Sequence, residues 1–156
     1  MNTAELALIE SAARGDVLDC LKLPPPDTDD GWYHIRATVL SDLLEGRYGA
    51  HLHSRGVQLT HARIVGEDPL LLESLRLPVG LKLKKCLLDC AIFAHNAWIP
   101  WLKVIDCQLP QLLADRIRVD GPVYLRGLST TANSDSGSVR LLGAKIGGNL
   151  ELDSSR

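Results

Sequence analysis

The stretch 81–130 decides the fold, and it reads LKLKKCLLDCAIFAHNAWIPW (81–101), LKVIDCQLPQLLADRIRVDGP (102–122) and VYLRGLST (123–130). These three lines repeat at an interval of about 21 residues, which is typical of solenoid coils. Apolar residues recur at equivalent positions, and we predict that they form the core column of a solenoid: Leu81, Leu102 and Val123; Leu83, Val104 and Leu125; Cys86 and Cys107; Leu88 and Leu109.

A finer pattern lies inside each repeat, because two apolar or small residues separated by one variable residue recur about every five positions. A helix would repeat at about 3.6 residues and a long strand at about 2. The shorter runs instead predict brief strands joined by corners, four to a turn, with turns stacked about 4.8 Å apart. The pairs expected to point inward include Ala62/Ile64, Leu70/Leu72, Ala91/Phe93 and Leu112/Ala114.

Four segments carry a resemblance to a known family: HARIVGEDPLLLESLRLP (61–78), LKLKKCLLDC (81–90), LADRIRVDGPVYLRGL (113–128) and VRLLGAKIGGNLELDSSR (139–156). They resemble the divergent pentapeptide-repeat-like proteins of actinobacteria, and the resemblance extends from about Ile35 to the end. It implies a mainly β fold, the right-handed quadrilateral β-helix. Two features depart from the pattern: Asp68-Pro69, since proline cannot donate to a ladder between coils, and the polar insertion 129–138, across which the register stays open.

The chain divides by composition into a helical N-terminal cap with a Pro-rich linker (1–50) and the β-solenoid (51–156). Thr3 is expected to cap a first helix that runs to about Arg14 and stops at Gly15.

A stiff linker and a second helix follow in the predicted cap. The run Leu23-Pro24-Pro25-Pro26 favours an extended linker, and the apolar periodicity predicts a helix from Ile35 to about Glu45. Because the apolar side of that helix needs a partner, we expect it to cover the open first coil of the solenoid.

Composition narrows the class of protein. Apolar residues make up 46% and charged residues 23%, with a formal net charge of −2, which indicates a globular chain. No run is long enough for a membrane span, and the first residues lack the order of a signal peptide, so we expect a cytoplasmic protein. The cysteines, Cys20, Cys86, Cys90 and Cys107, are then expected as buried thiols.

Catalytic and metal sites have little support in the sequence. His51, His53 and His61 form the densest histidine group, but no carboxylate or cysteine accompanies them at a fixed spacing, and surface histidines are the favoured interpretation. No nucleophile triad, phosphate loop or dinucleotide fingerprint is present, so no catalytic residue, cofactor or metal is expected.

Trp98, Ile99 and Trp101 form a candidate interaction patch at one corner. Two interpretations stay open: an exposed contact surface, or Trp98 inside the core with the rest packed against the N-terminal segment.

Three functions are weighed: a non-enzymatic scaffold for an unidentified protein partner, a DNA-mimicking regulator of DNA gyrase or topoisomerase, and an oxidoreductase-like enzyme. From Val57 onward the chain has 12 Lys and Arg against 10 Asp and Glu, whereas a DNA mimic needs a dense line of negative charge. The scaffold is therefore favoured. Two interpretations of the C-terminal coil stay open: an end-to-end homodimer through this coil, or a chain that is a shortened relative of a longer solenoid. Direct nucleic-acid binding is not expected.

Overall fold

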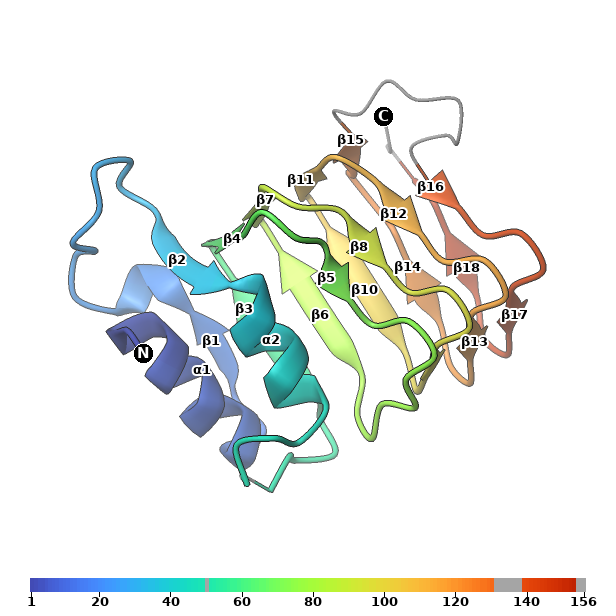
Figure 1. Cartoon of the computed structure of the whole chain (residues 1–156), viewed down its shortest axis with the longest axis horizontal. Coiled ribbons are helices and arrows are strands. Elements are labelled where there is room, and N and C mark those ends of the chain that lie inside the picture. Colours follow the sequence, from blue (N-terminus) through green and yellow to red (C-terminus); the bar gives the residue numbers. More distant parts are fainter. Residues whose placement is uncertain (50, 131–138, 154–156) are drawn as a thin grey trace.

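The computed structural model describes residues 1–49, 51–130 and 139–153, which form a parallel β-solenoid with helices at its N-terminal end (Figure 1). The expectation of a mainly β solenoid fold is thereby confirmed. Most of the insertion 129–138 lies outside the described residues.

Four parallel sheets, here called A to D, surround one apolar core. Sheet A consists of β1 (Val17–Asp19), β3 (Val57–Thr60), β6 (Leu81–Lys84), β10 (Leu102–Ile105), β14 (Val123–Tyr124) and β18 (Leu150–Glu151). Sheet B consists of β2 (Tyr33–Arg36), β4 (Ala62–Val65), β7 (Leu87–Leu88), β11 (Gln108–Leu109) and β15 (Ser129–Thr130). Sheet C consists of β5 (Leu70–Leu71), β8 (Ile92–Phe93), β12 (Leu112–Leu113) and β16 (Val139–Arg140). Sheet D consists of β9 (Trp98–Ile99), β13 (Arg118–Val119) and β17 (Lys145–Ile146).

The register between coils places apolar side chains directly above one another in the interior. Leu81 is paired with Leu102, and Leu102 with Val123. Since side chains alternate between the two faces of a strand, every second residue of each short strand points inward. The buried residues of these coils include Leu81, Leu83, Cys86, Leu88, Leu102, Val104, Cys107, Leu109, Val123 and Leu125.

Sheet C differs from the sequence prediction by one residue. Ala91 and Phe93 were expected to point inward, but Ile92 and Ala94 are the buried residues there. The reason is an extra residue at one corner: three residues separate Leu88 from Ile92, whereas two separate the equivalent positions of the next coil. A shift of one residue turns every side chain to the opposite face.

Helix α1 (Thr3–Arg14) begins with a capping box, and its cap lies one residue before Thr3, the cap expected from the sequence. The cap is Asn2, whose side chain accepts a hydrogen bond from the backbone N–H of Glu5 (2.8 Å). The Glu5 carboxylate in turn accepts from the backbone N–H of Asn2 (3.0 Å). At the other end, Gly15 adopts the left-handed conformation (φ 77°) and ends the helix as expected.

The N-terminal 50 residues also contribute strands to the solenoid. β1 pairs with β3 and β2 pairs with β4, with the short helix η1 (Cys20–Lys22) following β1. Ile35 belongs to β2, so α2 (Ala37–Leu44) begins two residues later than predicted. In Figure 1, α1 and α2 lie at the N-terminal end of the coils, and α2 packs beside β5, the first strand of sheet C.

A buried carboxylate joins α1 to β2. The side chain of Glu5 is 1% exposed and accepts hydrogen bonds from the Arg36 backbone N–H (3.0 Å), Nε (2.9 Å) and Nη2 (3.2 Å). Burial by itself would raise the pKa of Glu5, but the hydrogen bonds from Arg36 and Asn2 outweigh burial and hold this pKa below its ordinary value. The charged carboxylate is therefore the form that stabilises the cap.

We predict that Glu5→Gln lowers the free energy of unfolding at neutral pH by about 1–3 kcal/mol, because the Arg36 guanidinium loses its buried charged partner. A lowered pKa contributes stability above the pKa of the unfolded state, so the difference from wild type shrinks as the pH falls below about 4. Urea unfolding followed by circular dichroism at neutral and acid pH measures both effects.

The matched control is Glu10→Gln on the same helix, where the side chain is 71% exposed and lies 4.0 Å from Arg14. This change is expected to stay within about 0.5 kcal/mol of wild type. An equal loss in the two variants would contradict the assigned role of Glu5.

Candidate functional site

On sheet D, outward side chains of successive coils form a column of cations around one indole ring. Register places Trp98 between Arg76 and Arg118, and Arg118 beside Lys145. The two guanidinium carbons lie 3.9 Å and 4.0 Å from the centroid of the Trp98 ring. The Trp98 Nε1–H donates to the Asp120 carboxylate, 3.0 Å from each oxygen. The indole is thus fixed by two cation–π contacts and one charged acceptor.

Trp101 lies at the corner between sheets D and A, and glycine makes room for its ring. A Cβ on Gly80 would lie 2.2 Å from the indole, so no larger residue fits there without displacing it. The ammonium group of Lys103 lies 5.1 Å from the Trp101 ring centroid and 5.2 Å from that of Tyr124. The guanidinium carbon of Arg126 lies 5.6 Å from the centroid of the same Tyr124 ring.

The structure separates the residues of the candidate patch, Trp98, Ile99 and Trp101. Both tryptophans are half-buried on the outside of the coils, whereas Ile99 is 2% exposed and belongs to the core. Neighbours along a strand point to opposite faces, so Trp98 and Ile99 cannot share one surface. The expectation that Ile99 contributes to an exposed patch is therefore wrong.

Sheet C carries an apolar column that the sequence prediction missed. Register aligns Leu71 with Phe93, Phe93 with Leu113, and Leu113 with Arg140, all on the outer face. Leu71 is 51% exposed, and Phe93 and Leu113 are half-buried. The one-residue shift at the corner before Ile92 explains the omission, because it turns Phe93 outward.

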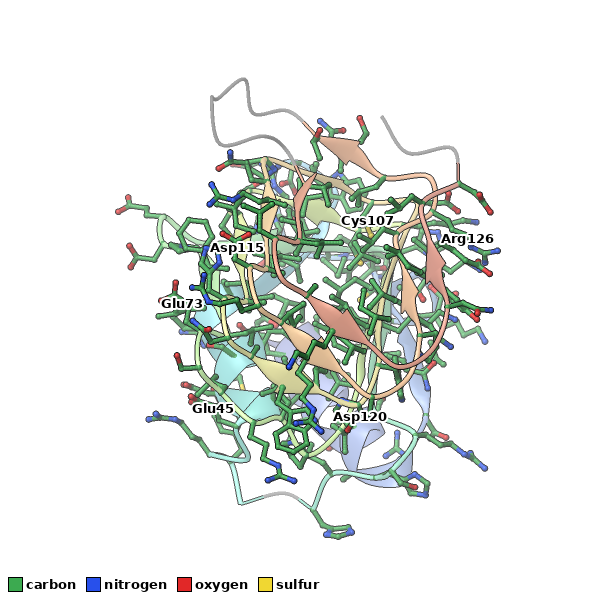
Figure 2. All side chains as sticks on the ribbon, turned by 90° about the vertical axis from the view of Figure 1, so that its right-hand side faces the viewer. Glu45, Glu73, Cys107, Asp115, Asp120 and Arg126 are labelled. Atoms are coloured by element: carbon green, nitrogen blue, oxygen red, sulfur yellow. The ribbon has the colours of Figure 1, made fainter. Side chains whose placement is uncertain are left out.

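Polar groups border this column. The Asp115 carboxylate lies 2.9 Å from Nη2 of Arg140 and accepts from the backbone N–H of Leu142 (3.2 Å). Figure 2 shows Asp115 and Glu73 on one side of the coils and Arg126 on the opposite side, so the outer faces of sheets C and A point away from each other.

Cys86 and Cys107 form a buried pair of free thiols in neighbouring coils. The Cys107 S–H donates to the Leu83 carbonyl (3.4 Å), and Cys86 donates to the Lys84 carbonyl (3.3 Å). The neighbouring Cys86 thiol, together with burial, raises the pKa of Cys107. Burial also raises the pKa of Cys20, to about 12. A thiol of high pKa holds little thiolate and reacts slowly.

The histidines are engaged separately. The ring of His53 lies against Gly15, and its Nδ1 accepts from the Arg55 backbone N–H (3.1 Å). Nδ1 of His61 lies 3.0 Å from the Asp19 carboxylate. Among residues 1–49, 51–130 and 139–153, no group of three or more His, Cys, Asp or Glu side chains is placed to hold a metal ion.

Comparison of the chain with protein-family models, with curated proteins and with solved structures finds no match. Of the helices in the described part of the chain, none combines the length and apolar character that crossing a membrane requires.

We predict that the cysteine thiols of the folded protein react with an aromatic disulfide reagent at least about 100-fold more slowly than an exposed thiol, because all four sulfur atoms are buried away from the reagent. The reference is Ser54→Cys, which adds a thiol at an exposed position. Absorbance of the released thiol follows the reaction with and without guanidinium. Rapid reaction of any native thiol in the folded wild type would contradict the buried placement.

Proposed function

We propose that this chain is a non-enzymatic scaffold that holds a protein partner against the outer face of sheet C. The observation that carries the proposal is the apolar column of Leu71, Phe93 and Leu113. An exposed apolar strip bordered by polar groups, here Glu73 and Arg140, is the usual composition of a protein-binding surface.

Rigidity supports this role. The backbone N–H of Leu70 donates to the Ala91 carbonyl (2.8 Å), and that of Ile92 donates to the Gln111 carbonyl (2.9 Å). These bonds set the spacing of the column before any partner arrives, so little conformational entropy is lost on binding.

The finer assignment to the pentapeptide-repeat-like proteins is part of the same proposal. It is supported by the four-sided coil and by the brief strands of two to four residues. A cytoplasmic location is supported by the four free cysteines, since disulfides are rare in reducing compartments.

No specific observation favours the other two functions. A DNA mimic needs about one negative charge per 1.7 Å of its length, whereas the outward column of sheet D in the described coils contains Arg76, Arg118 and Lys145. An oxidoreductase needs room for a cofactor, and aliphatic side chains fill the interior of the described coils.

We predict that Leu71→Glu combined with Leu113→Glu reduces retention of a cellular partner by the immobilised chain at least tenfold, because charge replaces the apolar contact surface. The control is Leu87→Glu, which places the same charge on the half-buried outer side of sheet B and is expected to leave retention unchanged. Quantitative mass spectrometry measures retention, and thermal melting verifies that each variant is folded.

A second experiment locates the partner contact without relying on binding affinity. It compares a photo-cross-linking residue at position 93, on sheet C, with one at position 87, on sheet B. Cross-linking from 93 alone supports the proposal. Equal retention by both variants, or equal cross-linking from both positions, would refute a contact on sheet C.

We also propose that the C-terminal coil pairs with the same coil of a second copy. Leu142, Leu150 and Leu152 are 61%, 46% and 48% exposed in this coil, and unpaired strand edges offer both donors and acceptors to an identical edge.

Light scattering coupled to size exclusion is expected to give the mass of a dimer for wild type and of a monomer for Leu150→Asp. The control Leu6→Asp, at an exposed position of α1, is expected to stay dimeric, and a monomeric wild type at high concentration would disprove the pairing.

A further inference from the structure

Sheet A carries a group of closely spaced cations on its outer side. Lys82 and Lys103 are direct neighbours in adjacent parallel strands, which lie about 4.8 Å apart, and Lys84 is two residues further along the same face. Partial burial lowers the pKa of Lys82, and the positive charges of Lys84, Lys103 and Arg126 lower it further. The four cations are therefore close enough to repel one another.

This positive charge is not balanced within the sheet. In the part of the chain that the structure describes, Lys82, Lys84 and Lys103 take part in no ion pair, and Arg126 lies 3.8 Å from Glu151. The other carboxylate within a strand of sheet A is Asp19, which already contacts His61 (3.0 Å). A bound anion would relieve the repulsion between the lysines and so gain binding free energy.

The cationic surface continues around the corner at Trp101 onto sheet D. There the column of Arg76, Arg118 and Lys145 adds three positive charges. One carboxylate faces this column, because Asp120 lies 3.9 Å from Arg118 and accepts from the indole N–H of Trp98. We call these residues together the basic face: Arg76, Lys82, Lys84, Lys103, Arg118, Arg126 and Lys145.

The aromatic rings next to the basic face, those of Trp101 and Tyr124, are half-buried and lie beside cations. The Trp101 ring lies against Gly56 and Gly80, with Lys103 near it. The Tyr124 ring contacts Lys103 and Arg126. Insertion into a lipid surface needs aromatic side chains that reach into the headgroup region, whereas here cations lie within 5.6 Å of the ring centroids of Trp98, Trp101 and Tyr124.

We propose that the basic face binds the phosphodiester backbone of a single-stranded nucleic acid without reading its bases. The face supplies cationic donors at strand spacing, which suits a ligand with one negative charge at every repeat. It also bends around a corner between two sheets, which a flexible single strand can follow. A duplex is stiff over about 150 base pairs and would contact one sheet alone. This inference concerns a different face from sheet C and does not depend on the protein-binding role proposed above.

The near-neutral charge of the solenoid concealed this face from the sequence analysis, which expected no direct nucleic-acid binding. A count of charges gives their sum, whereas the fold decides on which side of the coil each one lies.

Fluorescence anisotropy of a labelled oligothymidylate of about 20 nucleotides tests the proposal. If about four phosphates are neutralised, the logarithm of the association constant falls with the logarithm of salt concentration at a slope near −2.8, so binding weakens roughly 50-fold between 50 and 200 mM NaCl. An oligoadenylate of equal length is expected to bind within about threefold of this affinity, because no bases are read.

The decisive variant is Lys82→Gln, Lys84→Gln and Lys103→Gln combined. We expect at least a tenfold loss of affinity at low salt and a clearly shallower salt slope. The control removes three positive charges elsewhere, with Arg14→Gln, Lys22→Gln and Arg47→Gln, and is expected to stay within about twofold of wild type. Both variants have the same net charge, so the comparison isolates the position of the cations, and thermal melting verifies folding.

Three outcomes would overturn the inference. The first is no anisotropy change at low salt, and the second is an equal loss of affinity in both triple variants. The third is tighter binding to a duplex of the same length, or to phosphatidylserine vesicles, than to the single strand. A loss confined to the basic-face variant, with a duplex and vesicles bound more weakly, supports it.

Discussion

The inter-coil ladder of parallel backbone hydrogen bonds is the constraint on which the rest of the structure depends. It holds each coil about 4.8 Å from the next, so a residue in one coil lies directly on its equivalent in the coil before. Inside, this spacing leaves room for stacked aliphatic and small side chains such as Leu81 and Leu102, and for thiols such as Cys86 and Cys107. Such cramped interiors explain why the aromatic content is 4%.

The same ladder gathers outward side chains into columns. A residue type that recurs at one outward position produces a surface of one character, because its copies lie side by side. Sheet C in this way presents Leu71, Phe93 and Leu113, while sheet A presents Lys82 and Lys103. Figure 2 places the two faces on opposite sides of the coils, so a protein on one side leaves the other accessible.

The first coil is closed by a different kind of interaction. α2 packs beside β5, and α1 is joined to β2 through the ion pair between the buried Glu5 and the half-exposed Arg36. The Glu5 carboxylate loses its solvation and therefore needs the hydrogen bonds from Arg36, which few other arrangements of α1 would supply. We interpret this contact as the one that determines where α1 sits on the sheet.

The repeat interval, the core column and both N-terminal helices were predictable from the sequence, because inward positions accept few residue types and leave a visible pattern. The corner before Ile92 was not predictable. One added residue there changes no local secondary-structure preference, and yet it decides that Ile92 is buried and Phe93 is not. Likewise, nothing local indicates that β1 pairs with β3, or that Arg76 and Arg118 flank Trp98. Those neighbours are about 20 residues or more apart in the chain, and the hydrogen-bond register between coils alone brings them together.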